Sequence, residues 1–136
     1  MLEFRDPIPD IPVQRCETLM VQEYRYRGEL VSDANVIFLR VEDGTWHRFF
    51  IDAGVVFWKA VEGLNEFADD GDHHYSLKDI GAIHELVGKQ LSRVSAVDLS
   101  NGCEIRLDFE GGKAVILRNS DDRSELAFVS DDPRAR

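Results

Sequence analysis

Alternating apolar and polar residues predict strands along most of this chain. The clearest hairpin covers residues 35–52, where Asp43-Gly44 supplies the residue types of a two-residue turn with positive φ. Its inward face is expected to carry Ile37, Leu39 and Val41, followed after the turn by His47, Phe49 and Ile51. Residues 16–28 predict a further strand. Residues 55–61 are apolar on both faces, a pattern that fits either a strand or a buried helix.

The C-terminal half predicts an antiparallel meander. Four short alternating runs cover residues 91–99, 103–109, 113–119 and 125–129, and the first three are separated by Asn101-Gly102 and Gly111-Gly112. The alternation directs one face toward a core and the other toward solvent. The inward set is Ile105, Leu107, Phe109, Val115, Leu117, Leu126 and Phe128.

Residues 76–88, between the two β-rich halves, have the spacing of a helix. The positions that recur at this spacing are Leu77, Ile80, Ile83, His84 and Val87. Ser76 and Asp79 resemble a capping box, and Gly88 suits the position that follows a helix. The sequence therefore predicts an α+β fold, mostly antiparallel β, in which two meanders or hairpin units are joined by an acidic loop and one short helix.

Length and composition predict one globular domain over residues 13–130. The chain has 136 residues, of which 43% are hydrophobic, enough for a continuous core. Prolines in residues 1–12 predict an extended arm, and residues 131–136 predict a polar tail. Cys16 and Cys103 form no CxxC pair, and Cys103 alternates with inward residues. No apolar segment predicts a signal peptide or a membrane span, so we expect a cytoplasmic protein.

The net charge of −10 narrows the classes of partner. It disfavours nucleic acid, because phosphate contacts require a concentrated basic surface. It suits a basic protein met through electrostatic steering, although the same charge also serves solubility alone. The acidic loops that would steer such a partner are Asp69, Asp70 and Asp72, together with Asp121-Asp122.

Residues 67–76 crowd carboxylates and imidazoles together. Asp69, Asp70, Asp72, His73 and His74 fall within six residues, and such side chains bind zinc, manganese or iron. Their spacing matches no HxH, HxxxH or HExxH pattern, and adjacent histidines in an extended chain point in opposite directions. We therefore expect a solvated loop, with no metal and no cofactor.

No motif in the chain predicts catalysis. Neither the cysteines nor any serine lie in a G-x-S-x-G setting, and Gly88-Lys89 lacks the earlier glycine and the following Ser or Thr of a P-loop. Paired-carboxylate chemistry stays open, because the separations it needs are set by the fold. The sequence predicts that the protein is not an enzyme.

The outer face of the first hairpin combines aromatic residues with arginines. It carries Phe38, Arg40, Trp46, Arg48 and Phe50, and residues 24–27 extend it if their strand is a neighbour. Trp and Arg are frequent in interface hot spots, and arginine also binds anions through paired hydrogen bonds. Two interpretations stay open. The face is either exposed to a partner or covered by Val56, Trp58 or the helix.

Two stretches carry a resemblance to a known type of protein. The string DIGAIHELVGKQLSRV…GCEIRLDFEGGKAVILRN, from residue 79 onward, is similar to small bacterial proteins in which a short helix ending in LxGK or LxGx leads into a β-meander with FxxG turns. Upstream, DGTWHRFFIDAGVVFW has a similar character. Some proteins of this type accompany polymorphic toxins as immunity proteins. The resemblance implies a bacterial protein that binds its partner stoichiometrically, and it supplies no catalytic residue.

We therefore expect a non-enzymatic protein-binding domain of the immunity or accessory type. Its acidic loops would steer a basic partner, such as a toxin, and Trp46, Arg48 and Phe50, with Arg40 beside them, would anchor the interface. The alternative is a small-molecule binding protein or an enzyme, with an aromatic-lined pocket between the sheets. A third expectation is a homodimer formed through exposed edge strands.

Overall fold

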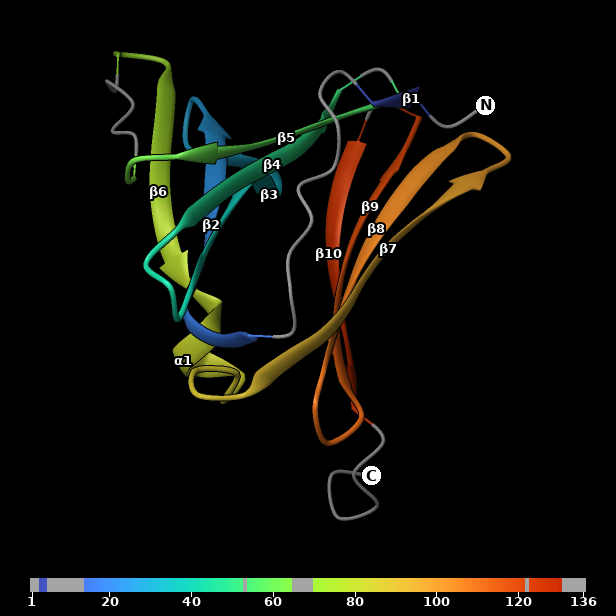
Figure 1. The fold of residues 1–136 in the computed structure, drawn as a ribbon. Coiled ribbons are helices and arrows are strands. Elements are labelled where there is room, and N and C mark those ends of the chain that lie inside the picture. Colours follow the sequence, from blue (N-terminus) through green and yellow to red (C-terminus); the bar gives the residue numbers. More distant parts are fainter. Residues whose placement is uncertain (1–2, 5–13, 53, 65–69, 122, 131–136) are drawn as a thin grey trace.

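The structure, a computed structural model, describes residues 3–4, 14–52, 54–64, 70–121 and 123–130 (Figure 1). Within these residues the elements are β1 (Glu3–Phe4), β2 (Gln14–Tyr26), β3 (Glu29–Val41), β4 (Trp46–Asp52), β5 (Val55–Val61), β6 (His73–Asp79), α1 (Ile80–Ile83), β7 (Gln90–Leu99), β8 (Gly102–Phe109), β9 (Lys113–Ser120) and β10 (Arg123–Ser130). Apart from Glu3–Phe4, the expected arm over residues 1–12 lies outside the described residues, as does the expected tail over 131–136.

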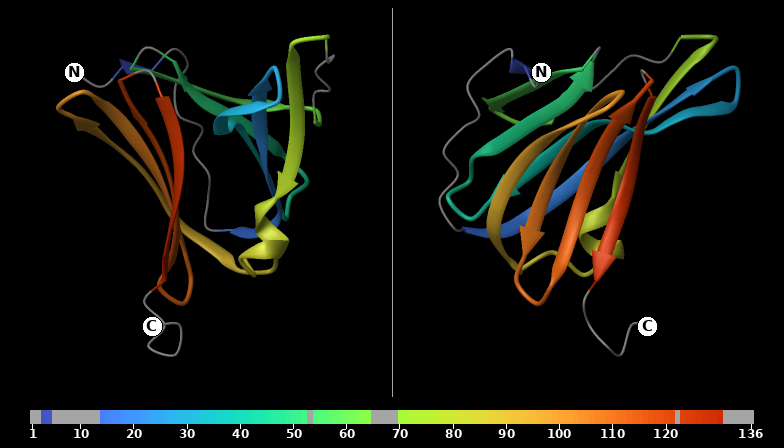
Figure 2. Two further views of the ribbon diagram at one scale, coloured as in Figure 1. Left: turned by 180° about the vertical axis from the view of Figure 1, so that it is seen from behind. Right: turned by 90° about the vertical axis from the view of Figure 1, so that its right-hand side faces the viewer.

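The strands form one hydrogen-bonded network that folds into two facing sheets (Figure 1 and Figure 2). The order is β1-β5-β4-β3-β2-β7-β8-β9-β10, and β6 also pairs with β2. Every pairing among the described strands is antiparallel except the short one between β1 and β5. Strand β2 links the sheets, because one of its edges pairs with β7 at Gln14–Arg15 and with β6 at Met20–Tyr26.

The main core lies between the two sheets. The first sheet contributes Leu19, Ile37, Leu39, Phe49 and Trp58, and the second contributes Ile105, Leu107, Val115 and Leu117. Burying each such side chain contributes roughly 1.5–3 kcal/mol to stability. The predicted inward residues of both halves are confirmed as buried or partly buried, except Phe128, which is 38% exposed. Residues 55–61, left open between strand and helix, form β5.

The helical part of the predicted α+β fold is wrong: the chain is nearly all antiparallel β, with one helix of four residues among those described. Residues 73–79 instead form β6, because the open edge of β2 offers them hydrogen-bond partners. Asp79 is itself the N-cap, accepting from the Ala82 N–H at 3.0 Å, so the expected Ser76–Asp79 capping box is absent. The helix ends early because Glu85 adopts a left-handed φ of 56° and the Leu86 N–H returns to the Gly81 carbonyl.

Two predicted turns close differently from the expectation. Asp43-Gly44 does not form a two-residue turn. The Gly44 N–H donates to the Val41 carbonyl and the Val41 N–H to Thr45, which is typical of a three-residue loop with a left-handed glycine. Gly102 lies in β8, directly opposite Ser120, rather than in a turn. A Cβ atom on Gly102 would lie 1.8 Å from the Asn119 carbonyl oxygen, so only glycine allows this strand pairing.

We predict that Gly102→Ala destabilises the fold by about 2–4 kcal/mol, because the β8–β9 ladder must shift to relieve the backbone clash. Urea denaturation measures the change in the free energy of unfolding. Gly63→Ala is the matched control, because a Cβ atom there meets nothing within 4 Å and φ is not left-handed. Equal stability of the two variants would contradict the prediction.

We also predict a pH dependence that arises from His47. This residue is buried and its Nδ1 accepts a 3.3 Å hydrogen bond from the Trp58 indole N–H, while burial lowers its pKa below the ordinary 6.5. Below pH 6.5 the unfolded chain therefore binds a proton that the folded chain excludes, so stability falls as the pH falls, by at most about 1.4 kcal/mol per pH unit. Unfolding by urea between about pH 5 and 7.5 measures this slope.

His47→Gln keeps an acceptor for Trp58 and should flatten that slope. The control is His74→Gln, which removes an exposed imidazole. A slope that is unchanged in His47→Gln would show that other groups carry the acid sensitivity.

Candidate functional site

The aromatic and arginine residues of the first hairpin lie on the face of the sheet that points away from the main core. Arg40 pairs across the strands with Trp46, and Phe38 pairs with Arg48. Phe38 is fully buried, whereas Arg40, Trp46, Arg48 and Phe50 are half-buried. Of the groups that the covered interpretation named, Val56 and Trp58 do not lie over this face, because their side chains pack in the main core on the opposite face.

Each arginine of this face contacts an aromatic ring. The Arg40 guanidinium lies 5.9 Å from the Trp46 ring centroid and also forms a 3.4 Å ion pair with Glu17. The Arg48 guanidinium lies 4.9 Å from the Phe50 centroid. These contacts hold the two arginines in place along neighbouring strands. Arg40 has an ion-pair partner, whereas Arg48 has none among the described residues.

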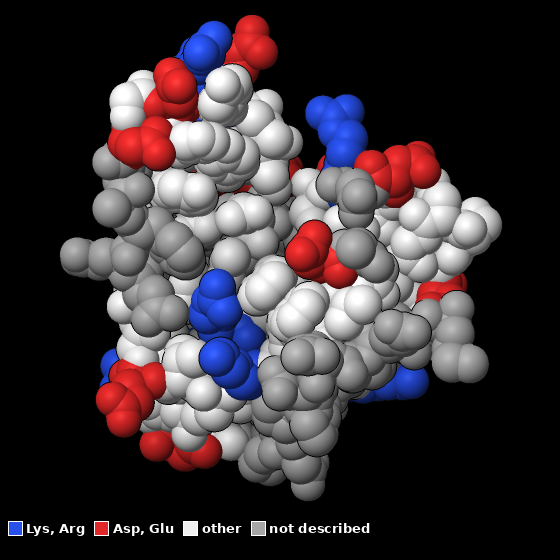
Figure 3. Space-filling view, turned by 90° about the horizontal axis from the view of Figure 1, so that it is seen from above, with Lys and Arg blue, Asp and Glu red and all other residues white. Residues whose placement is uncertain are grey.

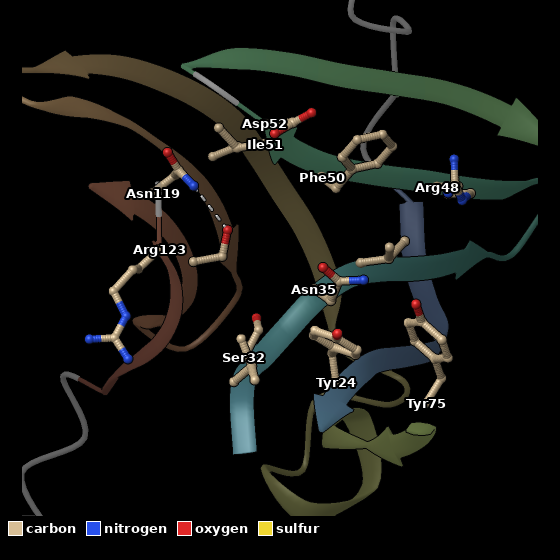
Figure 4. Close-up of a pocket in the computed structure, with 13 residues that line it drawn as sticks. Tyr24, Ser32, Asn35, Arg48, Phe50, Ile51, Asp52, Tyr75, Asn119 and Arg123 are labelled. Carbon is tan, nitrogen blue, oxygen red and sulfur yellow. Dashed lines mark hydrogen bonds between the residues drawn. The ribbon is translucent and has the colours of Figure 1, made fainter. Parts of the chain in front are cut away.

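Arg48 and Phe50 line a cleft of about 470 Å³ that both sheets build (Figure 4). Strands β2, β3, β4 and β6 form one side, and the neighbouring ends of β9 and β10 form the other. The remaining lining residues are Tyr24, Val31, Ser32, Asn35, Val36, Ile51, Asp52, Tyr75, Asn119, Arg123 and Ser124. Arg40 and Trp46 do not line it.

Two tyrosines form an aromatic wall of the cleft. Tyr24 and Tyr75 are cross-strand neighbours whose rings stack with centroids 5.1 Å apart. A 2.6 Å hydrogen bond joins the Tyr24 hydroxyl to His73 Nδ1. Partial burial, followed by the neighbouring Tyr75, raises the pKa of Tyr24, so its hydroxyl stays protonated. In Figure 4 both rings point upward into the space below Phe50.

Amide side chains are held in fixed orientations around the same space. Asn35 Nδ2 donates a 2.8 Å hydrogen bond to the side-chain Oε1 of Gln22, a residue that is fully buried. On the other side Asn119 donates 3.2 Å to the Ser124 hydroxyl, the dashed line in Figure 4. These bonds leave the Asn35 and Asn119 side-chain oxygens as acceptors beside the cleft.

Charged residues also line the cleft. Arg48 and Asp52 lie four residues apart on the same face of β4, with Phe50 between them. Burial lowers the pKa of Arg48, but an arginine stays charged at neutral pH. The two residues are about 13 Å apart along the strand, and Arg123 of β10 is a third charged residue of the lining.

The aspartates of the acidic loop bond to the backbone of the loop itself and to one arginine. Asp70 Oδ1 accepts from the N–H groups of Asp72 at 3.0 Å and His73 at 2.8 Å, and these bonds lower the pKa of Asp70. Asp72 pairs with Arg27 at 3.3 Å, near the tip of the β2–β3 hairpin. Arg40 lies toward the other end of that hairpin, opposite Thr18. The structure therefore does not bring these aspartates to the stripe, by which we mean the outer-face residues Phe38, Arg40, Trp46, Arg48 and Phe50.

The other acidic positions are equally dispersed. Asp121 accepts 3.1 Å from Asn101, and Asp69 and Asp122 lie outside the described residues. Figure 3 shows the described acidic side chains of one face in separate small groups, most of them near its rim and one close to the centre. A group of basic side chains lies left of the centre, separated from the acidic groups by neutral residues.

The metal-binding side chains of the described residues are dispersed, and both cysteines are buried. No group of three or more His, Cys, Asp or Glu side chains in the described part of the chain could hold a metal ion. Cys16 and Cys103 are both buried, and burial raises the pKa of Cys16 to about 12, which suppresses the reactive thiolate. None of the described helices has the length and apolar character needed to span a membrane.

Sequence reasoning found Arg48 and Phe50 but missed most of the cleft. The tyrosine wall had one signal, the aromatic residues at 24–26, which join the stripe because β2 is the neighbour of β3. Asn119 and Arg123 gave no signal, since they lie on strands about 70 residues later that reach the cleft only through the facing of the two sheets. Neither a family model, nor a curated protein, nor a solved structure matches this chain.

Proposed function

We propose that the protein binds a small molecule in the cleft between the sheets. The observation that carries this proposal is the convergence of side chains from both sheets on one space of about 470 Å³. Small-molecule sites have volumes of roughly 300–1,000 Å³ and combine apolar walls with a few placed polar groups. Tyr24, Tyr75 and Phe50 supply the walls, and Asn35 and Arg48 supply oriented polar groups.

The hydrogen bonds around the cleft support a preformed site. Gln22 and Asn35 are fixed by one bond, and Tyr24 is fixed by its bond to His73 and its stack on Tyr75. Side chains ordered before binding lose little further conformational entropy when a ligand arrives. This arrangement favours binding at the cleft over a role in which the same residues only stabilise the sheet.

Stoichiometric binding of a basic protein, of the immunity type, stays a prediction, as do the cytoplasmic location and the homodimer through edge strands. Arg40 and Trp46, outside the cleft, are the residues of the stripe best placed for a protein partner. That role would be supported if charge reversal of Asp70 abolished the capture of a basic partner and if the capture weakened steeply with salt.

We predict that filling the cleft abolishes ligand binding. Val31 lines the cleft and is 48% exposed, so Val31→Trp places an indole in the space with little strain on the core. Ligands that stabilise the wild-type protein in a thermal-shift screen of aromatic acids, nucleotides and sugars should bind the variant at least about tenfold more weakly.

Val97→Trp is the matched control, because Val97 is also 48% exposed but lies on β7, away from the cleft. Its ligand response should equal that of the wild type. Equal responses of all three proteins to every hit, or a screen without hits, would contradict a binding site in this cleft.

A further inference from the structure

Arg48 combines partial burial with the absence of an acidic partner. Five other described arginines pair with acids: Arg25 with Glu23, Arg27 with Asp72, Arg40 with Glu17, Arg106 with Asp108 and Arg118 with Glu104. Arg15, Arg93 and Arg123 form no ion pair with a described residue, but they are exposed to solvent. Arg48 forms no ion pair with a described residue, and its Nε is buried with no hydrogen-bond partner among them. Arg40 Nε also lacks a hydrogen bond, but it lies 3.4 Å from the Glu17 carboxylate. The contact of Arg48 with the Phe50 ring uses the guanidinium as a cation and leaves this Nε–H donor unpaired.

The residue opposite Arg48 adds a second positive charge at the edge of the cleft. Arg48 and Lys59 are direct cross-strand partners on β4 and β5, and their side chains lie on the same face; Lys59 is exposed and does not itself line the cleft. Like charges in this position destabilise a sheet. The chain carries 26 acidic residues against 16 basic ones, yet none of its described acids neutralises this pair. An anion bound between the two cations would remove the repulsion.

The surroundings of Arg48 define what the anion is attached to. Phe50, Tyr24 and Tyr75 line the same cleft and provide ring surfaces beside the guanidinium. Asp52 is about 13 Å away along β4, beyond the Debye length of about 8 Å at physiological salt, so it repels an anion at Arg48 only weakly.

We infer that the ligand carries a carboxylate or phosphate group, bound by Arg48 with Lys59 beside it, on an aromatic ring that packs against Phe50 and the two tyrosines. The inference rests on the proposed function, since it names the ligand chemistry of the same cleft. A planar guanidinium binds carboxylate and phosphate through paired hydrogen bonds, which would occupy the Nε–H donor that Arg48 leaves unpaired.

Isothermal titration with three probes of one ring tests this inference: benzoate, phenyl phosphate and the neutral benzyl alcohol. Both anions should bind the wild type at least about tenfold more tightly than benzyl alcohol, and Arg48→Gln should lose this preference. Lys59→Gln should reduce it by a smaller factor. Arg93→Gln, which removes an exposed arginine of β7 outside the cleft, should bind all three probes as the wild type does.

The comparison between the two anions identifies the group that the site prefers. Should Arg48→Gln not fold, as judged by circular dichroism, Arg48→Lys decides in its place, because it keeps the charge and loses the paired donors. Equal binding of benzyl alcohol and the anions overturns the inference, as does unchanged anion binding by the Arg48 variants or no binding of any probe. Neutral ligands that bind the wild type but not Val31→Trp would leave the proposed function standing while the anion inference falls.

Discussion

The structure depends on the way β2 shares its two edges. One edge pairs with β3 from Cys16 to Tyr26, and the other is divided between β7 at its start and β6 further along. A strand can serve two sheets only if it bends between them, and the register irregularities of β2 against β3 lie at Cys16–Thr18 and at Gln22–Arg25. The facing of the two sheets, and with it the core, follows from this division.

In the same arrangement, the first sheet has buried side chains on both of its faces. Val36, Ile37, Phe38 and Leu39 are consecutive and all buried, so β3 contributes to the main core with one set and to the opposite face with the other. An antiparallel sheet commonly leaves its second face to solvent. Here that face carries a buried glutamine, stacked rings and arginines, which is why it can hold a cleft as well as support the fold.

The electrostatics of the cleft run against those of the whole chain. The net charge is −10, and most of the described acids are exposed, so the long-range field repels anions. Local recognition overrides such a field when a cation is partly desolvated and its hydrogen-bond donors are preorganised, since interactions strengthen as water is excluded. The net charge alone would therefore mislead about the chemistry of a bound ligand, whereas the position of one arginine is informative.

The sequence by itself determined the strands and their inward residues, because alternation is a local property that each strand satisfies alone. It identified β2 to β4 and β7 to β10, left β5 open between strand and helix, and marked Arg48 and Phe50 as unusual on the outer face. It failed at residues 76–79, where the open edge of β2 outweighed a helical spacing that only the four residues of α1 retain. It also gave no sign that Asn119 and Tyr24 would line the same cleft. That proximity arises from the pairing of segments distant in the chain, and only the tertiary structure decides which strand edges meet.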